Sequence, residues 1–117
     1  MSLAFTTCAL ADPCEAPLPK KGETFSGPVT YIVDGDGLCV GEEQGGIEVR
    51  LADFRAIELN DPGGREAKAA LTRIAFGKTV SCVAGKHSWD RVVARCTLNG
   101  EGLGDLMRAA GIPEGGR

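Results

Sequence analysis

Short apolar runs broken by glycine-rich turns predict a chain built mostly from β-strands. Runs rich in Val, Ile, Leu and Thr are typical of strands when turn residues bound them. The predicted strands cover residues 29–33, 38–40, 47–54, 79–83 and 92–98. The seventeen glycines and six prolines agree with short elements joined by many turns.

Two segments have the spacing of helices instead. In the first, apolar side chains recur every three or four residues, which gives one apolar face. These residues are Ala67, Ala70, Leu71, Ile74 and Ala75. Gly77 follows them as a natural C-terminal cap. A second, short helix is predicted over residues 103–110, because Gly111 stops it and Pro113 prevents its resumption.

The predicted order is three strands, a helix, two strands and a helix. Five strands with a helix between the third and the fourth are typical of a small closed barrel of the oligonucleotide/oligosaccharide-binding (OB) type. The predicted fold class is therefore α+β, mainly β. We assign residues 28–112 to this domain, residues 12–27 to an extended lead-in and residues 113–117 to a frayed tail.

The first residues, 1–11, resemble the end of a signal peptide. They are apolar and small, and Ala9-Leu10-Ala11 has the small-x-small form of a signal-peptidase site, which puts a mature start at Asp12. The charged region and the full apolar region of a signal peptide are missing. Residues added for expression and a short disordered terminus are therefore the alternatives. No stretch is long enough to span a membrane.

Cysteine counting supports export. The chain has five cysteines, and removing the predicted signal residues, which include Cys8, leaves four. An even number suits two disulfides in an oxidising compartment, so we predict a secreted or periplasmic protein. Cys82 and Cys96 fall on two strands that flank one hairpin and are the expected pair, and Cys14–Cys39 follows by elimination. The alternative is that Cys82 and Cys96 are only small buried residues.

The charge balance disfavours one class of partner. The net charge is −3 and the pI is about 5.1. A protein that binds nucleic acid avidly and without specificity usually carries a basic face, so that class is disfavoured. An enzyme needs only a local basic patch, so nucleic acid remains a candidate partner.

Four charged residues carry the candidate chemistry, in the order acid, arginine, acid, arginine. They are Asp36, Arg50, Glu58 and Arg91. Hydrolysis of a phosphodiester requires charge stabilisation at the phosphate oxygens and an activated water. Carboxylates bind hard cations such as calcium, arginine forks bind two phosphate oxygens, and a glutamate can deprotonate water. The set therefore favours a phosphate site.

The chain resembles the staphylococcal-nuclease (thermonuclease) family from about Pro28 to Ile112. The motifs that carry the resemblance are Ile32-Val33-Asp34-Gly35-Asp36, Val49-Arg50-Leu51, Glu58, Gly64-Arg65-Glu66-Ala67 and Asp90-Arg91-Val92-Val93-Ala94. The resemblance implies a nuclease acting on DNA or RNA with calcium. It implies that Asp36 binds the metal, that Arg50 and Arg91 hold the scissile phosphate, and that Glu58 activates water. In each case the alternative is an exposed charge or a structural ion pair.

One residue departs from the family pattern at the metal site. Arg55 stands where the resemblance implies a second metal-binding aspartate. A guanidinium there removes a ligand and adds positive charge, and Arg55 could instead pair with Asp36 in place of the cation. Gly37 and Ile57 also replace a family threonine and proline. These departures put calcium-dependent activity in question.

Three hypotheses follow from the sequence. The first is a secreted nuclease-like phosphodiester hydrolase. The second is a nuclease-derived binding module without catalysis; short secreted members of the family are linked to exopolysaccharide (succinoglycan) biosynthesis, which suggests one setting. The third is a disulfide-stapled structural barrel. Trp89 could stack on a base, as in single-strand binders, but we expect it to pack over a barrel end.

Overall fold

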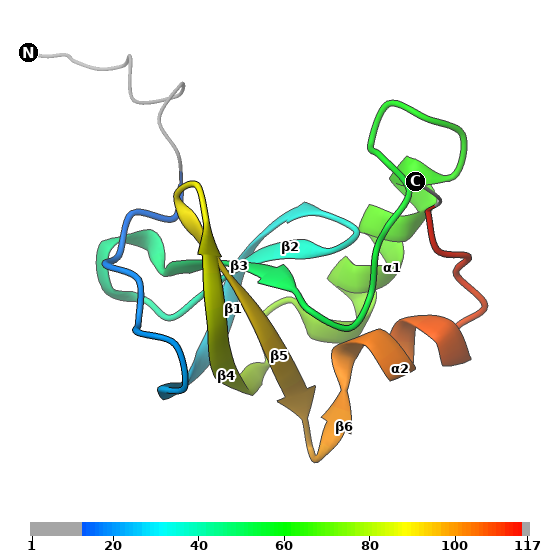
Figure 1. Cartoon of the computed structure of the whole chain (residues 1–117). Helices are drawn as coiled ribbons and strands as arrows, with labels where there is room; N and C mark the ends of the chain where they lie inside the picture. Colours follow the sequence, from blue (N-terminus) through cyan, green and yellow to red (C-terminus); the bar gives the residue numbers. More distant parts are fainter. Residues whose placement is uncertain (1–12, 116–117) are drawn as a thin grey trace, which may run out of the picture.

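The computed structural model describes residues 13–115, which form a mainly β structure with two helices (Figure 1). The strands are β1 (Thr24–Asp34), β2 (Gly37–Val40), β3 (Ile47–Leu51), β4 (Thr79–Ser88), β5 (Arg91–Leu98) and β6 (Glu101–Gly102). The helices are α1 (Gly64–Ala75) and α2 (Leu103–Ala109), and a short 3-10 helix, η2 (Glu43–Gly45), links β2 to β3.

Five of the strands form a ring. The sheet order is β3-β2-β1-β4-β5-β6, and an additional parallel pairing of β3 with β5 joins the two sides. The other neighbours pair antiparallel. Closure pairs the strand edges that an open sheet would leave free. The predicted mainly β, α+β class with a barrel-like ring of five strands is thus confirmed.

The core fills the inside of this ring and is covered by the helices. Buried residues alternate along the long strands, as period-two side chains must. On β4 and β5 they are Val80, Cys82, Ala84, Val92, Ala94 and Cys96. The predicted apolar face of α1 is buried, apart from the half-buried Ile74, and α2 adds Leu103 and Met107.

Several predicted boundaries are wrong because strand pairing overrides local propensity. Strand β1 begins at Thr24, inside the predicted lead-in, where it pairs with Val83 of β4. Strand β4 continues to Ser88, so the predicted loop shrinks to a tight turn at residues 89–90. Polar residues are accepted in these strands because the partner strand supplies their backbone hydrogen bonds. The short β6 was not predicted.

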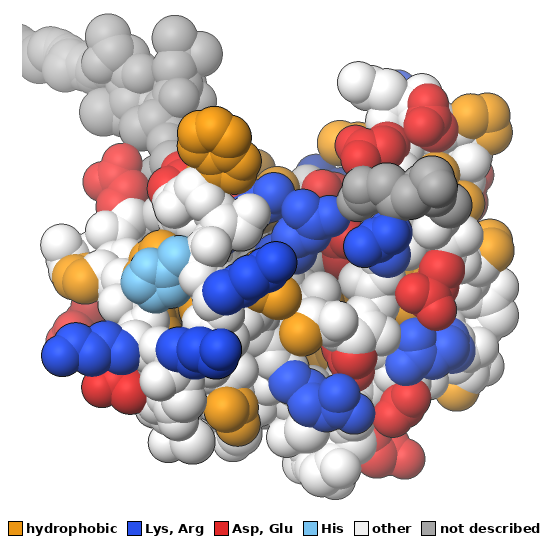
Figure 2. Space-filling view, viewed as in Figure 1, with side chains coloured by type: hydrophobic (Ala, Val, Ile, Leu, Met, Phe, Trp, Pro, Cys, Tyr) orange, Lys and Arg blue, Asp and Glu red, His pale blue; other side chains and the backbone are white. Residues whose placement is uncertain are grey.

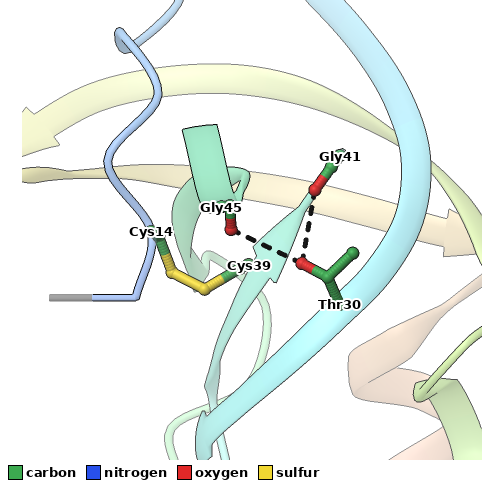
Figure 3. The surroundings of a disulfide bond; sticks show 5 residues. All are labelled: Cys14, Thr30, Cys39, Gly41 and Gly45. Carbon is green, nitrogen blue, oxygen red and sulfur yellow. Dashed lines mark hydrogen bonds between the residues drawn. A yellow bond between two sulfur atoms is a disulfide. The ribbon is translucent and has the colours of Figure 1, made fainter. Parts of the chain in front are cut away.

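Both predicted disulfides are present. Cys82 and Cys96 lie directly opposite each other on β4 and β5, where the bond joins two buried residues. Cys14 bonds to Cys39 and ties the lead-in to β2 (Figure 3). Beside that bond the hydroxyl of Thr30 donates to the carbonyl of Gly41 at 3.3 Å. The two disulfides therefore link different parts of the fold: one joins the lead-in to β2, and the other joins β4 to β5.

Some predictions fall outside the described residues. The signal-peptide assignment of residues 1–11, with Cys8 in it, and the start at Asp12 lie there, as does the end of the predicted tail at residues 116–117. Within residues 13–115 no helix is long and apolar enough to cross a membrane. The domain boundary at residues 28–112 stays a prediction.

Candidate functional site: a cationic cleft beside the barrel

A cleft of about 710 Å³ lies where β3, β4 and β5 meet the β3–α1 loop, α2 and residues 114–115. Its basic lining residues are Arg50, Arg55, Lys86 and Arg108, and its acidic ones are Asp36, Asp53 and Glu114. Figure 2 shows Lys and Arg side chains gathered across the middle of the face that it displays. The cleft therefore collects positive charge on a chain whose net charge is −3.

Strand β3 aims Arg50 into the cleft. Its neighbours Val49 and Leu51 are buried in the barrel, so the alternation of the strand turns Arg50 to the outer face. In the parallel pairing, Arg50 lies beside Val93 of β5, which also lines the cleft. Closure of the ring thus sets the position of this guanidinium.

A bulge brings Lys86 into the same cleft. The register of β4 and β5 shifts between Ala84 and His87, which leaves β4 with one extra residue. Bulges re-aim the side chains that follow them. Lys86, within the shifted stretch, and Ser88, just beyond it, line the cleft together with Val93. The extra residue therefore adds a cation to the site.

Asp36 lines the cleft and is held there by close packing of the β1–β2 turn. A Cβ on Gly35 would lie 2.6 Å from the Cβ of Ala67 and 2.7 Å from that of Ala56, so the turn approaches α1 and the β3–α1 loop as only glycine allows. This approach lets the Ala56 N–H donate to Oδ2 of Asp36 at 3.0 Å. Asp36 is only 8% exposed.

The environment of Asp36 makes its carboxyl group titrate near neutral pH. The pKa of Asp36 is raised from 3.8 to about 6; burial is the largest cause, and the neighbouring Asp34 carboxylate acts in the same direction. The hydrogen bond from Ala56 and the charge of Arg50 act in the opposite direction but do not offset burial. The Asp36 carboxyl group therefore takes up or releases its proton at a pH of about 6.

Arg55 does not pair with Asp36. Among the described residues the only ion pairs are those of Arg108 with Asp105 and with Glu114, so the hypothesis that Arg55 fills the place of a cation at Asp36 is wrong. The Arg55 side chain is exposed in the cleft lining instead. Arg50, Arg55 and Lys86 are thus cations with no carboxylate at ion-pair distance in residues 13–115.

Glu114 and Gly115, which the sequence assigned to a frayed tail, belong to the site. Glu114 forms a β-bridge with Ala56, and the Gly115 N–H donates to the Arg55 carbonyl at 2.7 Å. The Arg55 N–H donates to Oε1 of Glu114 at 3.0 Å, and Nη1 of Arg108 donates to Oε2 at 3.0 Å. The Arg55 hydrogen bond is the main reason why the pKa of Glu114 is lowered. Backbone pairing therefore holds Glu114 and Gly115 against the β3–α1 loop.

Two of the four predicted site residues do not line the cleft. Glu58 is exposed on the β3–α1 loop. Arg91 is half-buried at the start of β5, two residues from Val93 and so on the same face of the strand, and its Nε is buried without a hydrogen-bond partner among the described residues. The structure therefore brings Asp36 and Arg50 together, with Arg91 nearby and Glu58 apart.

The hairpin tip next to the cleft differs from expectation. Trp89 is 92% exposed, so the expected packing over a barrel end is wrong. The hairpin is nevertheless anchored, because Nε2 of His87 lies 2.7 Å from the carbonyl oxygen of Pro19 in the lead-in.

The described residues do not fit the calcium site that the resemblance implies. Calcium takes six to eight oxygen ligands. Asp36 offers one buried carboxylate that already accepts the Ala56 N–H, and Arg55 places a cation in the same lining. No group of three or more His, Cys, Asp or Glu residues in residues 13–115 is arranged to hold a metal. Asp53 also lines the cleft, but its carboxylate lies against Gly102 and Gly104 at the beginning of α2.

Sequence patterns did not identify three lining residues. Lys86 depends on the bulge, for which Gly85 inside a strand pattern was the available signal. Arg108 and Glu114 meet only in the fold, with no spacing motif to join them. Comparison with models of known protein families and with curated protein sequences found no match.

The titration of Asp36 predicts a pH-dependent gain in stability for Asp36→Asn. Because the folded-state pKa is raised from 3.8 to about 6, the stability linked to this proton is complete below pH 3.8 and is lost as the pH rises through about 6. An asparagine avoids the buried charge and still accepts the Ala56 hydrogen bond. After allowance for solvent screening, we expect it to raise the free energy of unfolding at pH 7.5 by about 1–2 kcal/mol.

Urea unfolding at several pH values measures this difference. The gain should shrink between pH 6 and pH 4, where the wild-type carboxyl group becomes protonated in the folded state. Asp61→Asn, at an exposed loop position, is the control and should show no such trend. A gain that stays constant down to pH 4, or a loss at pH 7.5, would contradict the assignment of the raised pKa to Asp36.

Proposed function

We propose that this chain is an exported, staphylococcal-nuclease-like barrel of the OB type that binds the phosphodiester backbone of nucleic acid in its cationic cleft. The five-stranded ring, with its parallel β3–β5 closure and with α1 between β3 and β4, supports the OB assignment. The two disulfides support a location in an oxidising compartment.

One observation carries the binding proposal. Arg50, Arg55 and Lys86 line the same cleft, and none of them is within ion-pair distance of a carboxylate in the described residues. Phosphate oxygens are the natural partners of such groups, because arginine forks bind two oxygens and lysine supplies a point charge. Because the chain as a whole carries net negative charge, only the cleft attracts an anionic ligand. Binding is therefore local and salt-sensitive rather than avid over the whole surface.

Asp36 contributes to this binding through its protonation state. In the same cleft as Arg50, an ionised Asp36 carboxylate repels a phosphate, whereas a protonated one carries no charge and can donate a hydrogen bond to a phosphate oxygen. A bound phosphate adds negative charge and raises the pKa of Asp36 further. Affinity for a phosphodiester should thus be higher below pH 6 than above it.

Arg55→Gln tests the binding proposal. Loss of one phosphate contact should weaken binding of a single-stranded DNA of about twelve nucleotides by about three- to tenfold. It should also lower the slope of log affinity against log salt by about 0.7. Fluorescence anisotropy at several salt concentrations measures both quantities.

Arg73→Gln removes the same charge from the exposed face of α1, outside the cleft, and is the matched control. Equal losses in the two variants would show that only net charge matters and would refute the cleft as the site. If the chain bound an anionic exopolysaccharide more tightly than DNA, the polysaccharide would be the ligand of the cleft in place of nucleic acid.

Hydrolysis of the bound phosphodiester is the second candidate function. It is favoured by one observation: Asp36, with a pKa of about 6, shares the cleft with Arg50, so a group able to exchange protons at neutral pH lies beside a phosphate-binding arginine. Glu58, to which the resemblance assigns water activation, is exposed outside the lining. The geometry therefore favours binding over calcium-dependent cleavage.

Arg55→Asp tests whether the metal site has lapsed. The substitution restores a carboxylate at the position where the resemblance implies a second ligand. We expect the unmodified chain to show no calcium-dependent cleavage of DNA or RNA and Arg55→Asp to bind calcium by calorimetry. Calcium-dependent cleavage by the unmodified chain, abolished by Glu58→Gln, would instead establish the hydrolase.

A further inference from the structure

We propose that the cleft contains a second anion subsite, formed by the Arg108 guanidinium and the Arg55 main-chain N–H, which Glu114 occupies in the free chain. The subsite would receive a further phosphate of the same ligand. This inference rests on the proposed function, because the ligand is the phosphodiester chain bound by Arg50, Arg55 and Lys86.

The contacts of Glu114 define the subsite. Oε1 accepts from the Arg55 N–H at 3.0 Å, and Oε2 accepts from Nη1 of Arg108 at 3.0 Å. Two donors thus converge on the two oxygens of one anionic group. Two oxygens of a phosphate can accept the same pair of donors. The Glu114 carboxylate is therefore an internal stand-in for a phosphate, located in a cleft lined by three other cations.

Arg108 does not depend on Glu114 for its position. Its Nη1 also donates to the carbonyl of Asp53 at 2.9 Å, and its Nη2 donates to Oδ1 of Asp105 at 2.9 Å. The guanidinium carbon lies 5.9 Å from the centre of the Phe54 ring. Because these contacts remain when Glu114 leaves, the donor stays oriented for a ligand, which lowers the entropy cost of binding.

Glu114 is held loosely enough to be displaced. Its side chain is 42% exposed, and exposed ion pairs are weak because water screens them. The segment is otherwise attached through the bridge to Ala56 and the hydrogen bond of Gly115 to Arg55. A ligand already bound by the other cations would bring its next phosphate to the subsite at high effective concentration.

Displacement implies reciprocal coupling between the tail and the ligand. If the ligand competes with Glu114, removal of the carboxylate must tighten ligand binding, and ligand binding must loosen the tail by the same free energy. The plain alternative is that Glu114 only clamps the tail to α2. A clamp would affect stability but would leave affinity unchanged or lower it.

Glu114→Gln tests the inference with the full chain and a single-stranded DNA of about twelve nucleotides. We expect affinity to rise by about two- to fivefold, the range that corresponds to loss of one exposed ionic contact. Glu101→Gln, at an exposed acid of β6 outside the cleft, makes the same chemical change and should raise affinity far less. Equal effects of the two variants, or no gain in Glu114→Gln, would overturn the inference.

An NMR measurement separates this inference from the proposed function. On DNA binding to the unmodified chain, the Gly115 amide should shift and exchange faster with solvent as its bond to Arg55 opens. DNA binding that leaves the Gly115 amide unchanged would refute the subsite while leaving the proposed function intact. If neither the unmodified chain nor Glu114→Gln bound DNA, both the subsite and the proposed function would be refuted. If only Glu114→Gln bound DNA, the subsite would be supported, because Glu114 would then block DNA binding in the unmodified chain.

Discussion

The parallel pairing of β3 with β5 is the constraint on which the site depends. It closes the ring, buries Val49 and Leu51 in the core, and leaves Arg50 beside Val93 on the outer face. The chain that leaves β3 then runs past the turn at Gly35 and meets the returning tail. Without this closure, the cations of β3, β4 and the β3–α1 loop would not share one cleft.

Electrostatics within the cleft are unbalanced in a way that suits an anionic ligand. Two of its three acids are accounted for: Asp36 is buried with a raised pKa, and Glu114 accepts hydrogen bonds from Arg55 and Arg108. The third, Asp53, has both carboxylate oxygens buried without a hydrogen-bond partner among the described residues. Three of its cations have no carboxylate at ion-pair distance among the described residues. Under the proposed function, the negative charge of a phosphodiester complements these cations at one place on a chain that is acidic as a whole.

The sequence predicted the order of five of the six strands, the apolar face of α1, both disulfides and the grouping of Asp36 with Arg50, but not all of the strand boundaries. It did so because burial periodicity and cysteine placement are local signals. It missed Lys86, Arg108 and Glu114 because their positions depend on a bulge and on contacts between distant segments. The exposure of Trp89 and the pairing of Glu114 and Gly115 were missed for the same reason, because the tertiary fold decides both.

A crystal structure of the chain with a short single-stranded oligonucleotide tests the central claim most directly. The account predicts a phosphate group in the cleft, in contact with the guanidinium groups of Arg50 and Arg55 and near the Lys86 ammonium group. Phosphates bound only elsewhere on the surface, with the side chains of these three residues left in contact with solvent, would contradict it.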